Sequence, residues 1–204
     1  MTGPKDLRRI WGGYTPGLLS APGRYAVLCP FIQRPDGLHV LLEVRAAGLK
    51  QGGEVCFPGG RAEPNETFEA CALRETFEEL AIPPEQIELI GKSDFLCVPG
   101  KSLIQPLLGL VSPSGLSAMV PAASEVAEVF TVPLAFLCST ESELYTYRLK
   151  AQLPQLFPYD TIGISPDYPW KGGVAEVPIW QYDGHVIWGM TARILLDIVR
   201  HLKT

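Results

Sequence analysis

The chain has 204 residues, of which 47% are hydrophobic and 19% charged, and its formal net charge at pH 7 is −5. This composition supports a sizeable buried core and excludes a disordered chain. The negative balance argues against nucleic-acid binding, because such surfaces concentrate Lys and Arg. A small anionic substrate remains compatible with it, since that needs only a few local cations.

No run of residues approaches the roughly 18 consecutive apolar positions of a membrane span, and the start of the chain lacks the apolar stretch of a signal peptide. The five cysteines are odd in number and form no C-x-x-C pair, which predicts reduced thiols and no zinc site. We therefore expect a cytoplasmic protein that does not contact membranes. No motif decides its oligomeric state, so a homodimer is an open expectation.

The first half of the chain predicts an arm, three strands and a helix. Residues 1–23 are rich in Gly and Pro and predict an N-terminal arm with a short helix near residues 7–11. Apolar runs predict strands at 25–32, 39–44 and 55–57, the last leading into Pro58-Gly59-Gly60. Residues 65–80 contain no Gly or Pro and predict a helix, which Pro83-Pro84 stops.

The second half predicts more strands and a closing helix. Strands are expected near 87–90, 103–111, 126–132 and 177–182, and helices near 134–138 and 188–202. Residues 151–173 contain several prolines and aromatic residues and predict a long loop or insertion. No repeat or linker divides the chain, so we expect a single domain over residues 1–204. Its class should be α/β, with a mixed sheet covered by helices.

The predicted helix carries the chemistry. Glu75, Glu78 and Glu79 fall within one arc of about 100°, and Leu73, Phe77 and Leu80 fall on the roughly opposite side, which we expect to face the core. Crowded carboxylates repel one another and are best stabilised around a hard divalent cation. Such a site suits hydrolysis of a phosphate anhydride, in which a metal-bound water attacks and a carboxylate takes its proton.

An E-x-x-E-E run alone is typical of a solvated helix face. Here it follows a Gly-Gly loop, which lets backbone pass close to a metal and its phosphate cargo. Arg74 can pair with Glu66 or with a member of the carboxylate cluster and so hold the loop on the helix. This combination favours a catalytic site over a solvated face.

The stretch resembles the Nudix box, G-x5-E-x7-R-E-U-x-E-E-x-G-U, in which U is an apolar residue. The matching positions are Gly60, Glu66, Arg74, Glu75, Glu78, Glu79 and Ile82. Two positions depart from the box: Thr76 stands at an apolar position, and Ala81 replaces the last glycine. Neither is a ligand position, so we expect the metal chemistry to be intact and the packing of the helix to differ.

The resemblance implies the Nudix α/β/α sandwich with a mixed sheet. It implies Mg²⁺ or Mn²⁺ bound by Glu75, Glu78 and Glu79, with Gly60 shaping the loop beside the metal and Glu66 and Arg74 bracing it. Nudix enzymes often draw a further ligand or general base from a later loop, and Glu125 is the candidate for that role here. The alternative for Glu125 is an ordinary loop carboxylate.

Residues 41–60 are similar to the motif that precedes the box in coenzyme A diphosphatases, L-L-T-x-R-[SA]-x3-R-x3-G-x3-F-P-G-G. Glu43 replaces its threonine, Lys50 replaces its second arginine, and the segment between Arg45 and Phe57 is one residue shorter. The similarity extends, with gaps, from about residue 24 to residue 202. It implies cleavage of the coenzyme A pyrophosphate to 4′-phosphopantetheine and 3′,5′-ADP.

A substrate with a diphosphate and a 3′-phosphate needs cations beyond the metal. Arg45 and Lys50, just upstream of the glycine loop, are therefore candidate substrate-binding residues. The shortened segment leaves open that Lys50 points into solvent. For the aromatic residues of the second half, packing is expected rather than stacking on an adenine; these are Tyr159, Tyr168, Trp170, Trp180 and Trp188.

Two alternative functions stay open. The same chemistry could act on ADP-ribose, on a dinucleotide such as NADH, or on a dinucleoside polyphosphate. This hypothesis stays open because the upstream motif differs from that of the coenzyme A diphosphatases. A catalytically silent module that senses a nucleotide is less favoured, because every glutamate of the box is present.

Overall fold

The computed structural model describes residues 4–14, 23–98 and 101–203. Within these ranges one large sheet has the strand order β3-β2-β1-β7-β5, and β4 pairs with β1, β6 with β7 and β8 with β2. The strands are β1 (Arg24–Arg34), β2 (Gly37–Arg45), β3 (Val55–Cys56), β4 (Gly59–Arg61), β5 (Ile87–Lys92), β6 (Leu96–Val98), β7 (Ser102–Val111) and β8 (Val126–Pro133). Strands β1 and β7 are parallel and the other pairs antiparallel, so the sheet is mixed.

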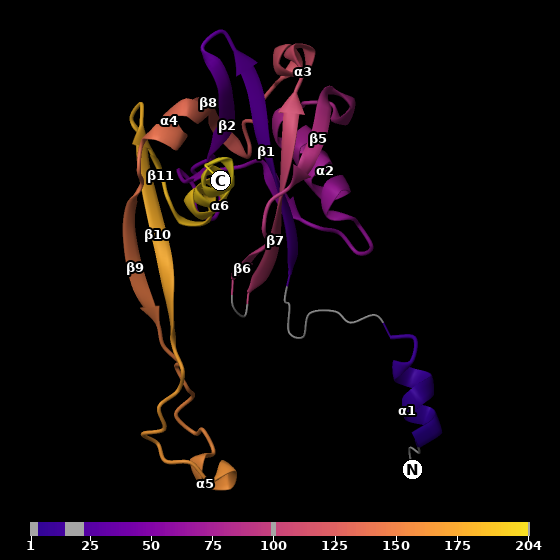
Figure 1. Cartoon of the computed structure of the whole chain (residues 1–204), viewed down its shortest axis with the longest axis vertical. Helices are drawn as coiled ribbons and strands as arrows, with labels where there is room; N and C mark the ends of the chain where they lie inside the picture. Colours follow the sequence, from indigo (N-terminus) through magenta and orange to yellow (C-terminus); the bar gives the residue numbers. More distant parts are fainter. Residues whose placement is uncertain (1–3, 15–22, 99–100, 204) are drawn as a thin grey trace.

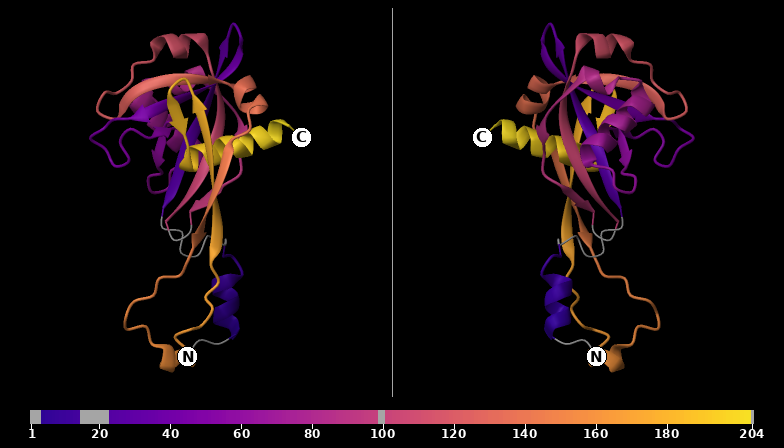
Figure 2. Two further views of the ribbon diagram at one scale, coloured as in Figure 1. Left: turned by 90° about the vertical axis from the view of Figure 1, so that its left-hand side faces the viewer. Right: turned by 90° about the vertical axis from the view of Figure 1, so that its right-hand side faces the viewer.

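Helices cover both faces of this sheet. Helix α2 (Phe68–Leu80) packs on one face and α6 (Gly189–Leu202) on the other (Figures 1 and 2). Successive side chains of a strand point to opposite faces, and on β2 Leu41 belongs to the core under α2, whereas Val40 and Leu42 belong to the core under α6. The expected α/β/α sandwich with a mixed sheet is confirmed.

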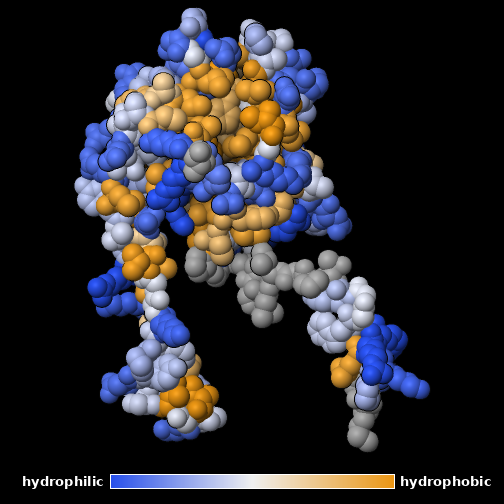
Figure 3. Space-filling view, in the orientation of Figure 1, coloured by the Kyte–Doolittle hydropathy of each residue, from blue (hydrophilic) through white to orange (hydrophobic). Residues whose placement is uncertain are grey.

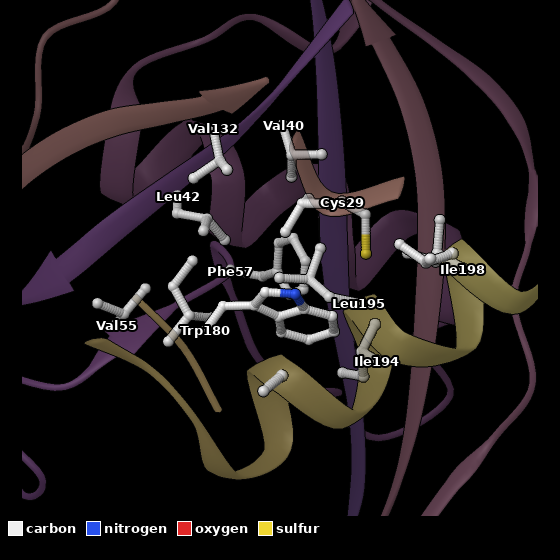
Figure 4. Close-up of a cluster of buried hydrophobic side chains, with 14 of the residues drawn as sticks. Cys29, Val40, Leu42, Val55, Phe57, Val132, Trp180, Ile194, Leu195 and Ile198 are labelled. Atoms are coloured by element: carbon white, nitrogen blue, oxygen red, sulfur yellow. The ribbon is translucent and has the colours of Figure 1, made fainter. Parts of the chain in front are cut away.

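A smaller antiparallel sheet lies on the far side of α6. It has the order β11-β10-β9, with β9 at Glu143–Leu149, β10 at Gly173–Tyr182 and β11 at His185–Ile187. Trp180 is only 2% exposed and packs in the core beside Phe57 and Leu195 (Figure 4), and its indole N–H donates to the Thr140 carbonyl at 3.0 Å. The packing role expected for Trp180 is therefore confirmed.

Strands β9 and β10 form an arm that projects from the body (Figure 1). At its end lie residues 150–172, close to the 151–173 over which a long loop was expected, and they include the short helix α5 (Tyr159–Ile162). The rings of Phe157, Tyr159, Tyr168 and Trp170 contact one another there, so these aromatic residues pack among themselves. Strand β9 was not predicted, because all seven of its residues are exposed and no burial pattern marks it.

The remaining elements are short. They are α1 (Pro4–Trp11), the 3-10 helix η1 (Pro84–Gln86), α3 (Pro113–Ala118) and α4 (Leu134–Ser139). Helix α1 buries none of its residues, and the rest of the expected N-terminal arm, 1–3 and 15–22, falls outside the described residues. All five cysteines are free; Cys29 and Cys71 are buried, and Cys97 is exposed. No helix within the described ranges is long and apolar enough to cross a membrane.

Apolar side chains gather on the face of the body shown in Figure 3, and a smaller group lies at the tip of the arm formed by β9 and β10. Beside the C-terminal end of α6, residues such as Phe31, Leu110 and Leu202 line a groove of about 300 Å³. None of the candidate site residues lines this groove, so the chemistry lies elsewhere on the molecule.

Candidate active site

The helix that carries the carboxylates has defined ends. The Thr67 side chain accepts a hydrogen bond from the Ala70 N–H at 3.1 Å, which caps the first turn of α2. At the other end, Ala81 adopts the left-handed conformation, with φ 55° and ψ 24°. This is where the Nudix box has its last glycine, and a left-handed residue at this position ends many helices. The helix therefore ends where the box predicts, although the Cβ of Ala81 makes this left-handed conformation unfavourable.

The predicted orientation of the helix was partly wrong. Phe77, which we expected to face the core, is 50% exposed. The buried residues of α2 are instead Cys71, Ala72, Thr76, Glu79 and Leu80. Glu79 therefore lies in the core-facing arc. The Thr76 hydroxyl is fully buried and donates to the Ala72 carbonyl at 2.7 Å, so a polar residue is accommodated at the apolar position of the box.

The glycine loop holds two of the carboxylates. The Gly59 N–H donates to Oε2 of Glu79 at 2.8 Å. A Cβ on Gly60 would lie only 2.4 Å from the carboxyl carbon of Glu75, so the Glu75 carboxylate packs directly on this glycine. Gly59 is also sterically required, because its φ is +151° and a Cβ there would meet the Ala26 carbonyl at 2.4 Å.

Arg74 ties the loop to the helix. Its Nε and one terminal nitrogen donate to the two oxygens of Glu66 at 2.9 and 3.0 Å, a bidentate geometry that favours strong pairing. Its other terminal nitrogen donates to Glu75 at 2.9 Å and to Glu78 at 3.1 Å. Both pairings considered from the sequence, with Glu66 and with the cluster, are thus present at once. The guanidinium lowers the pKa of Glu66 to about 2.

The carboxylates are crowded and partly desolvated. Burial, together with the charges of Glu43, Glu75 and Glu125, raises the pKa of Glu79 to about 8. Burial also raises the pKa of Glu75, with Glu78 and Glu125 adding to the effect. The three box glutamates differ in exposure. The side chain of Glu78 is 53% exposed and that of Glu75 is 17% exposed, whereas Glu79 is buried. The site therefore crowds several carboxylates around the guanidinium of Arg74.

The carboxylates of Glu75, Glu78 and Glu79 are chemically suited to bind a divalent metal. Carboxylate oxygens are the ligands that Mg²⁺ and Mn²⁺ prefer. Burial and neighbouring carboxylates raise the pKa of Glu75 and Glu79, and a bound divalent cation would favour their ionised forms. Within the described residues, no group of three or more acidic, His or Cys side chains is already gathered into a metal-holding arrangement. Arg74 instead donates to both Glu75 and Glu78 in this arrangement.

Glu125 lies close to the cluster. It precedes β8, and its carbonyl accepts the Ala46 N–H at 2.8 Å, which places it beside the end of β2. Its charge acts on Glu75, Glu79 and Glu43. The structure thus brings this later loop to the carboxylates, and the role of Glu125 as ligand or base stays a prediction.

A cavity of about 430 Å³ opens beside the glycine loop. Gly59 and Gly60 form one wall, Arg45 and Lys50 contribute the basic groups, and Trp188 lies at the start of α6. Lys50 is exposed but still lines this cavity, so the shortened segment does not carry it away. Trp188 is 44% exposed, and the packing expected for it from the sequence is therefore only partial.

Sequence reasoning overlooked Glu43 as a site residue. It lies on β2 and is 1% exposed, and its charge is the second largest influence, after burial, raising the pKa of Glu79. The signal was present as an acidic residue inside the apolar run His39-Val40-Leu41-Leu42-Glu43-Val44. A charge in the middle of a buried strand is rare unless it is paired or functional.

Comparisons with known proteins identify the family. The NUDIX domain profile matches residues 22–136, more than half of the chain. The chain belongs to the Nudix hydrolase family, whose members are pyrophosphatases that act on phosphoanhydride bonds and generally use divalent metals.

Two relatives match most of the chain. An uncharacterized Nudix hydrolase NudL from Photorhabdus laumondii is 34% identical over 190 residues, covering 92% of this chain and 90% of that protein. The human mitochondrial coenzyme A diphosphatase NUDT8 is 31% identical over 198 residues, covering 94% of this chain and 75% of that protein. Among solved structures, the Nudix hydrolase RenU from M. smegmatis is 25% identical with a TM-score of 0.49, covering 58% of this chain and 75% of the other.

Proposed function

We propose that this chain hydrolyses the pyrophosphate bond of coenzyme A or its thioesters, with Mg²⁺ or Mn²⁺, to 3′,5′-ADP and 4′-phosphopantetheine or its acyl form. The observation that carries the proposal is the shared wall of the glycine loop. Gly59 and Gly60 contact Glu79 and Glu75, and the same two glycines line the cavity to which Arg45 and Lys50 contribute. A phosphoanhydride held in that cavity is within reach of the carboxylates.

The proposed roles follow from position. Glu75, Glu78 and Glu79 would hold the metal, which supplies charge neutralisation of the phosphate oxygens and a bound water of lowered pKa. Gly60 keeps the space that the Glu75 carboxylate needs, and the Arg74–Glu66 pair fixes the loop on the helix. Glu125 is our candidate to accept the proton of the attacking water, or to serve as a further ligand.

The cavity supports a substrate with extra phosphate charge. Arg45 and Lys50 are two cations in a cavity that lies outside the carboxylate cluster, and a 3′-phosphate gives them a partner that ADP-ribose and NADH lack. The Trp188 ring has an exposed face on which an adenine can stack. The name of the human relative, a coenzyme A diphosphatase, supports the same substrate.

Product chromatography tests the proposal. The purified protein is incubated with coenzyme A, acetyl-coenzyme A, ADP-ribose, NADH and diadenosine polyphosphates, each with Mg²⁺, with Mn²⁺ and with a chelator. We expect metal-dependent release of 3′,5′-ADP from the coenzyme A compounds at the highest kcat/KM. Faster turnover of another substrate would contradict the assigned specificity and keep the chemistry. No turnover of any compound would favour a silent module.

A charge variant tests the substrate side of the cavity. Arg45→Gln should raise KM for coenzyme A more than KM for 3′-dephospho-coenzyme A, because only the former offers the additional phosphate. Arg34→Gln, which changes the exposed last residue of β1, serves as the matched control. Equal changes for both substrates would show that Arg45 does not bind the 3′-phosphate.

A further inference from the structure

Glu43 shares a face of the sheet with the candidate metal ligands. Strand β2 alternates, so that Val40 and Leu42 pack in the core under α6 and Leu41 packs in the core under α2. By this period of two, the side chain of Glu43 is directed to the α2 face. Helix α2 carries Glu79 on its buried side. The charge of Glu43 is the largest charge effect on Glu79, so the two carboxylates lie near each other on this face.

The Glu43 carboxylate is buried and only half satisfied. The residue is 1% exposed. Its Oε1 accepts the Cys56 thiol at 3.3 Å, and its Oε2 is buried without a hydrogen-bond partner. A thiol is a weak donor, and a buried carboxylate with an unpaired oxygen is costly unless it is paired or coordinates a metal. The side chain therefore lacks a positive or donating partner at Oε2.

The charges around Glu43 point to a cation as that partner. Glu79 and Glu125, both candidates for the metal centre, act on the same buried region. Arg45 is the basic residue whose charge acts on Glu43, yet no hydrogen bond joins the two. One arginine does not balance three neighbouring carboxylates.

We propose that Glu43 belongs to the metal centre of this chain and contributes its Oε2 to the coordination of the divalent cation, alongside Glu79. This inference rests on the proposed function and deepens it. The upstream motif that the chain resembles has a threonine at this position, so the added carboxylate is a property of this chain's own sequence. The competing explanation is a neutral Glu43 that serves only to pair with Cys56.

The test measures metal binding directly. Binding of Mn²⁺ is followed by electron paramagnetic resonance for the wild type, for Glu43→Gln and Glu43→Thr, and for the control Glu88→Gln, which changes an exposed carboxylate on β5. Removing the charge at Glu43 should weaken Mn²⁺ binding at least about tenfold, the lower range for residues that support a metal. Glu88→Gln should bind as the wild type does.

The outcomes separate this inference from the proposed function. If the wild type binds Mn²⁺ and both Glu43 variants bind it equally well, Glu43 is not part of the centre, and the proposed function stands. If the wild type does not bind Mn²⁺ at all, both are overturned. Circular dichroism in chelator establishes that each variant is folded. The threonine of the related motif provides the second variant should Glu43→Gln not fold.

Discussion

Gly60 and Glu75 are packed so closely that residue 60 has no room for a side chain. A Cβ there would lie 2.4 Å from both the carboxyl carbon and Oε2 of Glu75. The first glycine of the box motif is thus explained by Glu75, the first of the three clustered glutamates, fifteen positions further along the chain. A single methyl group at residue 60 would force this carboxylate out of its place.

Gly60→Ala should therefore cost activity without unfolding the protein. A displacement of about 1 Å in an active site can cost about 100-fold in rate, and we expect a loss of that order in kcat. Gly91→Ala is the matched control, because its Cβ would meet no atom within 4 Å. Steady-state kinetics decide the matter, and near wild-type turnover of Gly60→Ala would show that the position of Glu75 is unimportant.

Glu79→Gln should have opposite effects with and without metal. The pKa of Glu79 is raised from 4.5 to about 8, so the metal-free fold binds its proton more tightly than the unfolded chain does and loses stability as pH rises between these values. The glutamine removes that loss and can still accept the Gly59 N–H. In chelator at pH 8.5 the variant should melt higher than the wild type, whereas Mn²⁺ should raise the melting temperature of the wild type more than that of the variant.

Differential scanning calorimetry with chelator and with Mn²⁺ measures both effects. A variant that is less stable than the wild type in chelator at pH 8.5 would mean that the Glu79 carboxylate is stabilising on its own. That outcome would contradict the argument that the buried Glu79 carboxylate needs a bound metal cation.

Glu66→Gln should change how the free energy of unfolding depends on pH. Arg74 lowers the pKa of Glu66 from 4.5 to about 2, so the pair stabilises the fold fully above pH 4.5, and this contribution declines as pH falls toward 2. The difference in unfolding free energy between wild type and variant should be largest near pH 6 and shrink by pH 3. Urea denaturation at the two pH values measures it. A difference that does not change with pH would contradict the ion pair.

Ala81→Gly should stabilise the protein. Ala81 ends α2 in the left-handed conformation at φ 55°, which costs a residue with a Cβ roughly 1 kcal/mol or more relative to glycine. Restoring the glycine should raise the free energy of unfolding by about 1 kcal/mol. Ala70→Gly, at an exposed position of the same helix, should lower it by up to about 1 kcal/mol. Equal signs for the two substitutions would refute the conformational explanation.

The sequence predicted much of the fold because its strands are apolar runs and its principal helix is bounded by Gly and Pro. It predicted the composition of the carboxylate cluster because the spacing of Glu75, Glu78 and Glu79 is a property of the helix alone. It misplaced Phe77 because periodicity describes a helix without its neighbours. The strands against which α2 packs decide which arc of the helix is buried, and the periodicity of the helix does not contain that information.

Contacts between distant segments were beyond sequence reasoning. Glu43 joins the site only because the fold brings its strand, β2, near Glu79 of α2. Trp188 reaches the cavity lined by Arg45 and Lys50 only because α6 begins beside β3. Strand β9 escaped prediction because its residues are exposed and its pairing with β10 is distant in the chain. The domain division, the roles of the site residues and a homodimer stay predictions.

The most direct test of the account compares wild type with Glu78→Gln on coenzyme A. Glu78 is half exposed, and its pairing with Arg74 is one of several that Arg74 makes, so the variant should fold normally. Release of 3′,5′-ADP is quantified with Mn²⁺ and with chelator. We predict metal-dependent release by the wild type and a loss of at least about 100-fold in the variant, since even supporting residues of metal sites cost 10- to 100-fold. Near wild-type release by a folded Glu78→Gln would contradict the assigned metal site.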